Sequence, residues 1–383
     1  MKKVPELRFK EFKDEWKEEK LGDIGNIIYG KGLTSDNYDN NGDSLIIGTG
    51  GIIAKSYSFI DKGETIIIPR KGTISRVFYF KKNQKFWTID TTFYLKLSES
   101  ISYKFIYFYF KKINLEFLNE STGVPSLNIN NLKKILFFLP SSTEQQKIAL
   151  FLSSIDKKIE LTDKKLEFLE KYKKGLMQKL LTGKIRFPGF KDEWKEEKLG
   201  NFIKIQGGYA FKNKLFKEKG IPIIRISNLS IDGKYTNINN LVYYDKTEND
   251  NNFIIKRNDL LIAMSGATAG KVSVYNKKNI AYLNQRVGLF KLIKFDKLDY
   301  NYMTQYAFSN FFNNQLKSLL ATSAQPNISS KDIEKLKIKL SSLPEQQKIA
   351  SFLSAIDKKI ELIKSRFENL KKYKKGLFQK MFV

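Results

Sequence analysis

One stretch of this chain occurs twice. Glu144–Leu180 reads EQQKIALFLSSIDKKIELTDKKLEFLEKYKKGLMQKL, and Glu345–Met381 reads EQQKIASFLSAIDKKIELIKSRFENLKKYKKGLFQKM, 201 residues later without a gap. A second pair agrees with it: RFKEFKDEWKEEKLG at Arg8–Gly22 and RFPGFKDEWKEEKLG at Arg186–Gly200. A self-match of this length constrains the architecture more than any other feature of a sequence. We therefore expect two half-proteins in tandem, each a variable globular block followed by a nearly identical helix.

The repeated segments predict two long helices with a coiled-coil seam. Apolar residues recur in each copy at alternating steps of four and three residues, and both seams break at a lysine, Lys173 and Lys374. At about 1.5 Å per residue, each helix would be on the order of 55 Å long. The predicted seam residues are Ile148, Leu152, Ile155, Ile159, Leu166, Leu169 and Leu176 in the first copy and Ile349, Leu353, Ile356, Ile360, Phe367, Leu370 and Leu377 in the second.

The most direct partner for each helix is the other copy. If a pseudo-two-fold axis relates the half-proteins, the helices pair in antiparallel orientation. Two alternatives stay open: each helix packs only on its own block, or it pairs in parallel within a homodimer. Apolar residues off the seam, among them Phe151 and Phe352, predict either a face for another protein or a cover over the junction with the block. Ser141 with Glu144, repeated as Ser342 with Glu345, predicts a capping box at each helix start.

The blocks between the helices read as mixed α and β structure. Short apolar runs bounded by Gly, Asn and Asp predict strands. Helical, aromatic-rich stretches follow at 102–119 and 298–320. The predicted strands are Ser44–Ile47, Gly51–Ala54, Thr65–Pro69, Ile74–Phe80, Phe86–Ile89 and Thr92–Leu97, then Ile221–Ile226, Phe253–Lys256, Asp259–Met264, Lys271–Tyr275 and Arg286–Leu292, and a short helix near Ile129–Lys134 leads into Ile135–Leu139. We predict an α+β fold: globular α/β domains at 1–140 and 184–341, separated by a long antiparallel two-helix coiled coil from segments 141–183 and 342–383.

The charge of the chain indicates a polyanionic partner. There are 68 Lys and Arg against 40 Asp and Glu, a formal net charge of +28. This excess favours nucleic acid, although AT-rich coding bias alone would explain why lysine outnumbers arginine. The chain has no Cys and no His, which excludes disulfides, Cys/His zinc sites and histidine acid–base catalysis. No apolar run reaches about 18 residues, and the first residues are charged, so we expect a soluble cytoplasmic protein without a metal site.

Enzyme motifs are weak or missing. SerGlyAlaThrAlaGlyLys at 265–271 has one residue too few between its glycines for a Walker loop, and Val272 follows the lysine. The Asn-Pro-Pro-aromatic motif of DNA amino-methyltransferases and a glycine-rich cofactor loop are not found. GluTrpLys at 15–17 and 193–195 resembles part of a nuclease motif, so a stand-alone nuclease is retained as an alternative, as is a coiled-coil adaptor that does not bind DNA.

The remaining polar residues suit DNA recognition. Gly-rich turns that carry Arg and Lys allow close approach to phosphate, and Gln and Arg can grip base edges with two hydrogen bonds. Each residue alone more often has a structural role. As a set, the predicted DNA-binding residues are Lys55, Arg70, Lys71, Arg76, Thr91 and Thr92 in the first block and Arg225, Ser227, Asn228, Ser265, Lys271, Gln285, Arg286, Ser323, Gln325 and Asn327 in the second.

These residues together resemble the specificity subunit of a type I restriction–modification system, over essentially the whole chain. The resemblance rests on PheProGlyPhe…GluTrp…LysLeuGly at 187–200, SerGlyAlaThrAlaGlyLysVal at 265–272, LeuAsnGlnArgVal at 283–287, AlaGlnProAsnIleSer at 324–329 and ProGluGlnGlnLysIleAla…Leu…IleAsp…Ile at 344–360. The first half departs from this pattern: it reads PheLysGluPhe at 9–12, IleAspThrThrPhe at 89–93 and GlyValProSerLeuAsn at 123–128. Residues are therefore carried over more safely in the second block.

The resemblance implies a division of labour. Each globular block would be a target recognition domain that reads one half of a split site in double-stranded DNA, and the helices would set the unread gap. The same helices would bind two modification subunits, which methylate adenine, and restriction subunits would join to cleave. The chain itself would have no catalytic residues and no cofactor, with S-adenosylmethionine, ATP and Mg on the partner subunits.

Overall fold

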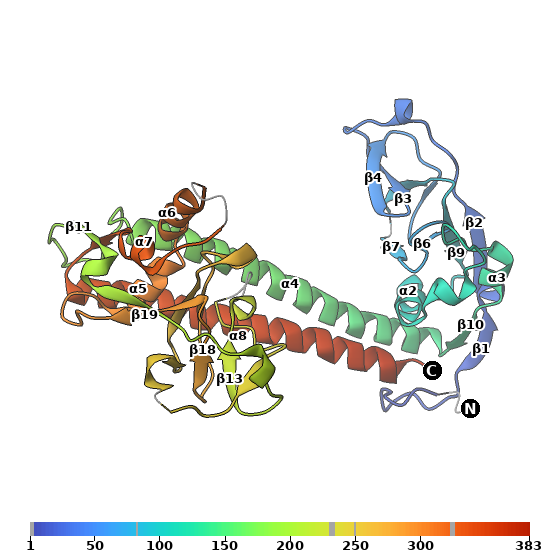
Figure 1. The fold of residues 1–383 in the computed structure, drawn as a ribbon. Coiled ribbons are helices and arrows are strands. Elements are labelled where there is room, and N and C mark those ends of the chain that lie inside the picture. Colours follow the sequence, from blue (N-terminus) through green and yellow to red (C-terminus); the bar gives the residue numbers. More distant parts are fainter. Residues whose placement is uncertain (1–3, 82, 230–233, 249, 322–325) are drawn as a thin grey trace. The chain divides into compact units, whose positions relative to one another are not determined.

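The computed structural model describes residues 4–81, 83–229, 234–248, 250–321 and 326–383 (Figure 1). The chain divides into two compact units. Unit 1 combines Met1–Lys164 with Ser365–Val383, and unit 2 is Lys165–Lys364. The predicted DNA-binding residues Ser323 and Gln325 lie outside the described residues. Within the described part, no helix combines the length and the apolar character needed to cross a membrane.

Unit 1 contains three small sheets and several helices. Its sheets have the strand orders β1-β10, β4-β3-β8-β5 and β2-β9-β6-β7. The strands are β1 (Lys17–Lys20), β2 (Gly25–Tyr29), β3 (Ser44–Gly48), β4 (Gly51–Ser56), β5 (Asp61–Lys62), β6 (Thr65–Pro69), β7 (Phe78–Phe80), β8 (Lys85–Thr88), β9 (Thr92–Leu97) and β10 (Leu136–Leu139). The helices are α1 (Leu21–Ile24), α2 (Tyr103–Lys112), α3 (Ile129–Lys133), the first part of α4 (Ser142–Leu180) and the last part of α8 (Leu343–Met381).

Unit 2 repeats this plan with other residues. Its sheets have the orders β11-β20, β14-β13-β18-β15 and β12-β19-β16-β17, so every sheet of unit 1 has a counterpart. The strands are β11 (Lys195–Lys198), β12 (Ile203–Gly207), β13 (Ile221–Ile224), β14 (Val242–Tyr244), β15 (Ile254–Ile255), β16 (Leu260–Ala263), β17 (Val272–Val274), β18 (Ala281–Leu283), β19 (Val287–Leu292) and β20 (Lys337–Leu340). Its further helices are α5 (Tyr300–Ala307), α6 (Asn310–Ala321) and α7 (Ser330–Glu334).

The central strands are apolar throughout because both of their faces are covered. Successive side chains of a strand point to opposite faces. In β6, Ile66 and Ile68 join the core cluster that includes α2 and α4, while Ile67 joins the cluster between the two larger sheets. In β16, Leu260 and Leu261 divide between two clusters in the same way. Continuous apolar runs such as Thr65–Pro69 therefore mark buried strands.

The strand predictions are right for the apolar runs and incomplete elsewhere. Thr65–Pro69 and Thr92–Leu97 match β6 and β9. The predicted strand Ile74–Phe80 is too long, because only Phe78–Phe80 pairs as β7. The preceding residues turn instead: the Ile74 amide donates to Gly72 O (2.9 Å) and the Arg76 amide to Thr73 O (3.0 Å). Several strands were not predicted, among them β2, β12 and β18; β18 has only three residues, and β2 and β12 contain polar residues and glycine.

The residues at each helix start form an ion pair with the segment that precedes the block. The capping-box prediction is half right in the first copy: Ser141 Oγ accepts from the Glu144 amide at 3.4 Å. The Glu144 carboxylate does not turn back to the cap. It accepts two hydrogen bonds from the Arg8 guanidinium, from Nε at 2.8 Å and Nη2 at 2.7 Å. In unit 2, Glu345 accepts from Arg186 at 2.9 and 2.8 Å.

The glutamine that follows each glutamate holds a second helix. The Ser102 amide, at the start of α2, donates to Gln145 Oε1 at 2.9 Å, and Gln145 Nε2 donates to Pro140 O at 3.0 Å. In unit 2, the Asp299 amide, at the start of α5, donates to Gln346 Oε1 at 3.0 Å. The repeated GluGln pair thus joins three segments of each unit at one point.

The off-seam phenylalanines next to these pairs cover the junction with the lead-in segments. Phe151 packs edge-on against Phe9 with ring centroids 5.7 Å apart, and Phe352 packs against Phe187 at 5.5 Å. For these two residues, the prediction of a cover over the block–helix junction is the one that the contacts support.

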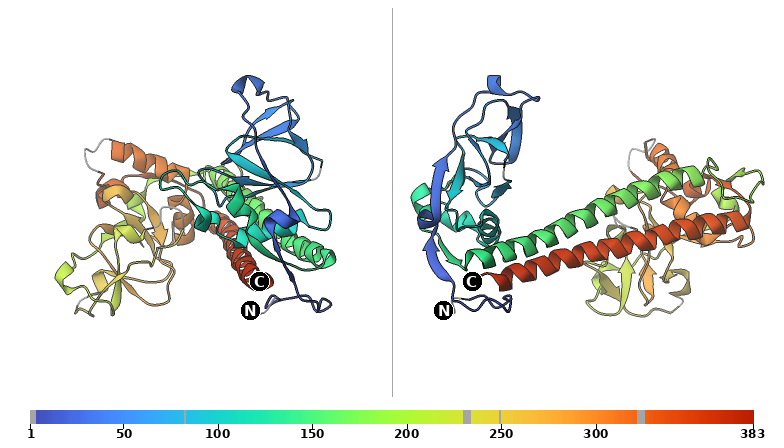
Figure 2. Two further views of the ribbon diagram at one scale, coloured as in Figure 1. Left: turned by 90° about the vertical axis from the view of Figure 1, so that its right-hand side faces the viewer. Right: turned by 180° about the vertical axis from the view of Figure 1, so that it is seen from behind.

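Within each unit, one end of α4 lies beside the opposite end of α8 (Figure 2). In unit 1, the start of α4 shares a core with the end of α8, including Ile148, Leu152 and Leu377; in unit 2, Leu180 shares a core with Leu353. The pairing is therefore antiparallel. All the predicted seam residues are buried or half-buried.

The lysines that interrupt the seam form ion pairs with the other helix. Lys173 Nζ lies 2.5 Å from Asp357 in unit 2, and Lys374 pairs with Asp156 in unit 1. Asp357 also accepts from Lys234 at 2.8 Å and Gln305 at 3.0 Å. Burial alone would raise the pKa of Asp357, but the charges of Lys173 and Lys234 more than offset this, and the pKa lies below its usual value. Burial lowers the pKa of Lys173, so the carboxylate is the stabilised member of the pair.

This shift predicts an acid-sensitive contribution to the stability of unit 2. An aspartate with a lowered folded-state pKa stabilises the fold above its unfolded pKa, here about 3.8, and that contribution is lost as the pH falls through the folded pKa. We expect the stability of the wild type to fall more steeply below about pH 5 than that of Asp357→Asn. Urea unfolding at a series of pH values measures this.

Asp156→Asn is the matched control. Asp156 is 38% exposed and pairs with a single lysine, whereas the Asp357 side chain is 11% exposed. Replacing Asp156 should therefore change the acid dependence of the stability less than replacing Asp357. If the stability of the wild type and of Asp357→Asn fell equally with pH, the lowered pKa of Asp357 would be contradicted.

Candidate nucleic-acid interface

In unit 2, three segments that are distant in sequence meet beyond the end of β16. The Met264 amide donates to Arg286 O at 2.9 Å, and the Ile328 amide donates to Met264 O at 2.8 Å. Ser265 forms an isolated bridge with Asn327. These backbone contacts place Ser265, Arg286 and Asn327 side by side. The sequence-based prediction therefore selected residues that the fold does bring together.

Exposed side chains surround this point. Gln285, Arg286 and Asn327 are exposed, whereas Ser265 is buried. The Gln285 amide donates to Tyr209 O at 3.0 Å, which adds a tyrosine that is 48% exposed. Among the described residues, Arg286 has no ion-pair partner. A free guanidinium beside amide side chains and an aromatic ring is suited to contact phosphate or base edges.

A glycine-containing turn completes the cluster in unit 2. Gly266 and Gly270 have φ of 75° and 82°, in the left-handed region that favours glycine. Between them lies the short 3₁₀ helix Gly266–Thr268, which contacts a second one at Ile226–Asn228 through Thr268 Oγ1 and Ile226 O (3.4 Å). Lys271 is exposed after the turn. The turn thus holds a lysine and the neighbouring exposed Ser227 close to the cluster.

Unit 1 builds the same junction from different residues. The Arg70 amide donates to Thr91 O and the Leu127 amide to Arg70 O, both at 2.8 Å, and Lys71 forms a bridge with Ser126. The Arg70 guanidinium lies 5.4 Å from the centre of the Tyr29 ring, which is 46% exposed. Unit 1 therefore presents Arg70, Lys71 and Thr91 where unit 2 presents Met264, Ser265 and Arg286.

Several predicted residues have structural roles instead. Asn228 is buried: its Oδ1 accepts from the Arg225 amide at 3.0 Å and its Nδ2 donates to Asn237 O at 3.1 Å. Thr92 is buried, and its hydroxyl donates to Ile89 O at 2.7 Å. Arg225 is half-buried and donates to Asn240 O at 3.2 Å. Because their polar groups are used inside the blocks, we no longer expect Asn228 and Thr92 to contact DNA.

Two predicted residues of unit 1 take no part in the backbone contacts of the junction. Lys55 is exposed on β4, in the sheet that does not carry Arg70. Arg76 is exposed after the turn, with its guanidinium 5.4 Å from the centre of the Phe78 ring. The sequence reasoning also missed Tyr29 and Tyr209. Their signal was an aromatic residue next to a glycine turn after a strand, in TyrGly at 29–30 and GlyGlyTyr at 207–209.

The GluTrpLys triplets have a structural explanation. Trp16 is buried in the core of unit 1, and Trp194 Nε1 donates to Glu345 at 3.1 Å in unit 2. The triplets therefore anchor the lead-in segments, and nothing in their surroundings favours a nuclease site.

Comparison with known proteins gives one consistent result. The model of the family described as "Type I restriction modification DNA specificity domain" matches residues 13–171 and 191–372. The chain belongs to this family. It carries two copies of the family's domain, and each match includes one block and most of the helix that follows it.

Relatives and solved structures agree with this membership. The chain is 31% identical over 286 residues to the type I restriction enzyme MjaVIII specificity subunit of Methanocaldococcus jannaschii, covering 70% of this chain and 67% of that protein. It is 29% identical to the putative MjaX specificity subunit of the same organism, over 70% of this chain and 62% of that protein. The chain therefore spans about two thirds of the length of these relatives.

The fold is also that of a solved specificity subunit. A crystal structure of a type I restriction–modification system S subunit from M. genitalium matches with a TM-score of 0.70 at 17% identity, over 99% of both chains. A chain from a structural study of assembly and conformational transition in a type I system matches with a TM-score of 0.54 at 15% identity, over 97% of this chain and 98% of that one. At these identities the likeness shows the fold alone.

The junction in unit 2 depends on a glycine that has no room for a side chain. A Cβ at Gly208 would lie 2.0 Å from Leu283 O and 2.4 Å from Asn284 O. We expect Gly208→Ala to displace the strand end next to Gln285 and to destabilise the unit by about 1–3 kcal/mol, as overpacking typically does. Thermal unfolding measures the loss.

Gly207→Ala is the control for this substitution. A Cβ at the adjacent Gly207 would meet nothing within 4 Å, so this variant should keep its melting temperature. Equal stability of the two variants would show that the close approach at Gly208 is not needed.

Proposed function

We propose that this chain is the DNA-recognition subunit of a type I restriction–modification complex and that each block reads one half of a split target in double-stranded DNA. The observation that supports this is the doubled junction: one backbone arrangement presents the exposed Lys71 in unit 1 and the exposed Arg286 in unit 2. A shared frame with different exposed side chains suits two different half-sites. Phosphate contacts from lysines would set the register, and the junction residues would read bases in the major groove.

The helices offer the same exposed side chains twice. Leu161 and Leu362 are 57% and 71% exposed, and Tyr172 and Tyr373 are 47% and 54% exposed, at equivalent positions of the two copies. Exposed apolar residues that recur at this spacing support docking of a protein partner at two equivalent places. We propose that this partner is the modification subunit, bound twice. It would carry S-adenosylmethionine, with ATP and Mg on restriction subunits that join the same complex in the cytoplasm. This chain would supply no catalytic group.

The target itself is measurable in a host. Mapping methylated adenines in cells that carry this chain and its modification subunit should give a motif of two short sequences separated by a fixed unread gap. Methylation at a continuous site, or none above the background of cells without the chain, would contradict the proposal.

Arg286→Ala tests the division between half-sites. If Arg286 grips a base edge in the second half-site, its loss should cost about 1–3 kcal/mol in binding and relax selectivity at one base pair of that half-site alone. Binding to targets mutated in either half-site, measured by fluorescence anisotropy, gives the answer. Arg70→Ala removes the arginine of the unit 1 junction and should affect the first half-site. Equal loss on unrelated DNA would make Arg286 a phosphate contact.

The length of the helices predicts the length of the unread gap between the half-sites. α4 and α8 each contribute residues to both units, so we propose that they act as the ruler between half-sites. Removing one heptad from each helix, about 10 Å at ~1.5 Å per residue, should shorten the tolerated gap while leaving both half-site sequences unchanged. Adenine mapping measures both quantities, and an unchanged gap would refute the ruler.

A further inference from the structure

The two copies of the repeated helix use one of their faces differently. On α8, the residues Ser354, Asp357 and Glu361 face unit 2. Lys234 Nζ lies 2.8 Å from Asp357, the Tyr235 hydroxyl donates to Glu361, and Gln305 Nε2 lies 3.3 Å from Ser354 Oγ. The block of unit 2 thus covers this face with a lysine, a tyrosine and a glutamine.

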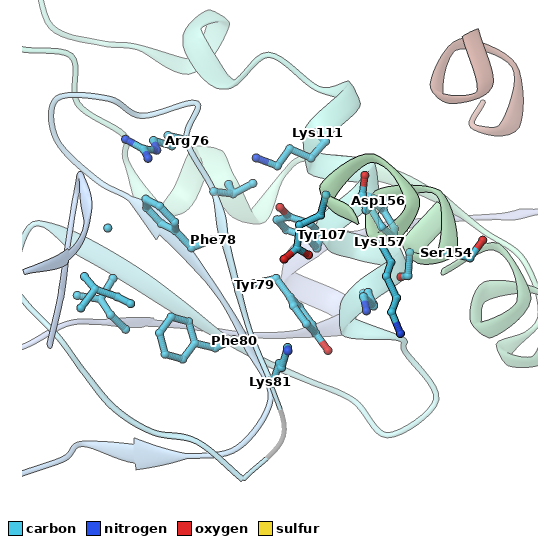
Figure 3. Close-up of a pocket in the computed structure, with 18 of the residues that line it drawn as sticks. Arg76, Phe78, Tyr79, Phe80, Lys81, Tyr107, Lys111, Ser154, Asp156 and Lys157 are labelled. Carbon is cyan, nitrogen blue, oxygen red and sulfur yellow. The ribbon is translucent and has the colours of Figure 1, made fainter. Parts of the chain in front are cut away.

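On α4, the same face borders an open groove. Ser153, Asp156 and Glu160 are the equivalents of Ser354, Asp357 and Glu361, 201 residues earlier. They line a groove of about 1070 Å³ between α4, α2 and the segment around β7 (Figure 3).

The groove carries a surplus of positive charge. Arg76 and Lys81 come from the segment around β7, Lys111 from α2 and Lys157 from α4 (Figure 3). Lys104 of α2 also lines the groove. Among the described residues, none of these five forms a salt bridge. The two carboxylates of the groove are already neutralised, because Glu160 pairs with Lys164 at 2.6 Å and Asp156 pairs with Lys374.

Aromatic rings hold two of these lysines without neutralising them. Lys104 Nζ lies 5.3 Å from the centre of the Tyr79 ring, and Lys111 Nζ lies 5.2 Å from that of Tyr107. Burial lowers the pKa of Lys111, and the nearby charges of Lys374 and Arg76 lower it further. Ring contacts orient an ammonium group but leave its charge unpaired. An anion in the groove would relieve the repulsion among these cations.

The position of the groove favours DNA as the source of that anion. Arg70 and Lys71 of the junction and Arg76 of the groove belong to the single turn that joins β6 to β7. A duplex held at the junction would meet the groove through this turn. We propose that the groove binds phosphates of the DNA backbone flanking the first half-site, and that unit 2 makes no equivalent contact because Lys234 and Tyr235 occupy the corresponding helix face. This inference rests on the proposed function and makes the two half-sites unequal.

The chain contains a matched pair of lysines for the test. Lys157 lies in the groove, and Lys358 is its exposed equivalent on α8. In the complex of the full chain with its modification subunits, the affinity for the mapped target is measured across a range of salt concentrations. Each lost phosphate contact should reduce the slope of log K against log salt by about 0.9. We expect this reduction for Lys157→Gln and for Lys104→Gln, and an unchanged slope for Lys358→Gln. Ethylation interference should show extra phosphate contacts flanking the first half-site only.

The outcomes separate the two proposals. If the wild-type complex does not prefer the mapped split target over scrambled DNA, the proposed function fails. If it does prefer that target but Lys157→Gln and Lys104→Gln keep the wild-type slope, only the groove inference fails. If Lys157→Gln prevents assembly with the modification subunits, as judged by gel filtration, the occupant of the groove is a protein and the inference is overturned.

Discussion

The buried ion pair between an arginine of each lead-in segment and the first glutamate of each repeated helix is the interaction on which both units depend. Glu144 and Glu345 are almost fully buried, and each receives a two-pronged hydrogen bond from Arg8 or Arg186. Removing the arginine would be destabilising, since the carboxylate would stay buried without its partner. The next glutamine holds the helix that follows the sheets. The lead-in segment before each block and the repeated helix after it therefore meet at this ion pair.

This arrangement explains why parts of the chain repeat closely and others diverge. The helix residues satisfy several neighbours at once: the lead-in arginine and phenylalanine, the start of α2 or α5, and the opposite helix. A substitution there would leave buried groups without partners. Most positions in the block interiors need only apolar side chains of suitable size, and exposed side chains at the strand ends, such as Gln285 and Arg286, carry few packing constraints. Different recognition surfaces can therefore be built on one frame.

The long-range periodic features were predictable from the sequence, because each has a repeated signal. The self-match predicted two units, the four-three spacing predicted the helix seam, and the apolar runs predicted β6, β9 and β16. The pairing partners of isolated polar residues were not predictable. Nothing local indicates that Glu144 bonds Arg8 rather than its own cap or that Lys173 meets Asp357, since each partner lies more than 100 positions away and only the folded chain brings it near. Strands of three residues such as β18 lack enough residues to display a period.

The same limit explains one asymmetry between the two copies of the helix. Asp156 and Asp357 stand in nearly identical sequence, yet Asp357 meets Lys234 and Gln305 while Asp156 faces an open groove. The difference comes from the blocks. In unit 2, the helix α5 carries Gln305. In unit 1, the corresponding helix α2 carries Phe108, and Lys374 Nζ lies 5.8 Å from the centre of the Phe108 ring. Whether a face of the repeated helix is covered or open thus depends on the block that packs against it. Near-identity of sequence therefore establishes equivalent positions in the frame, and the environment of each position decides whether it is covered or free to bind.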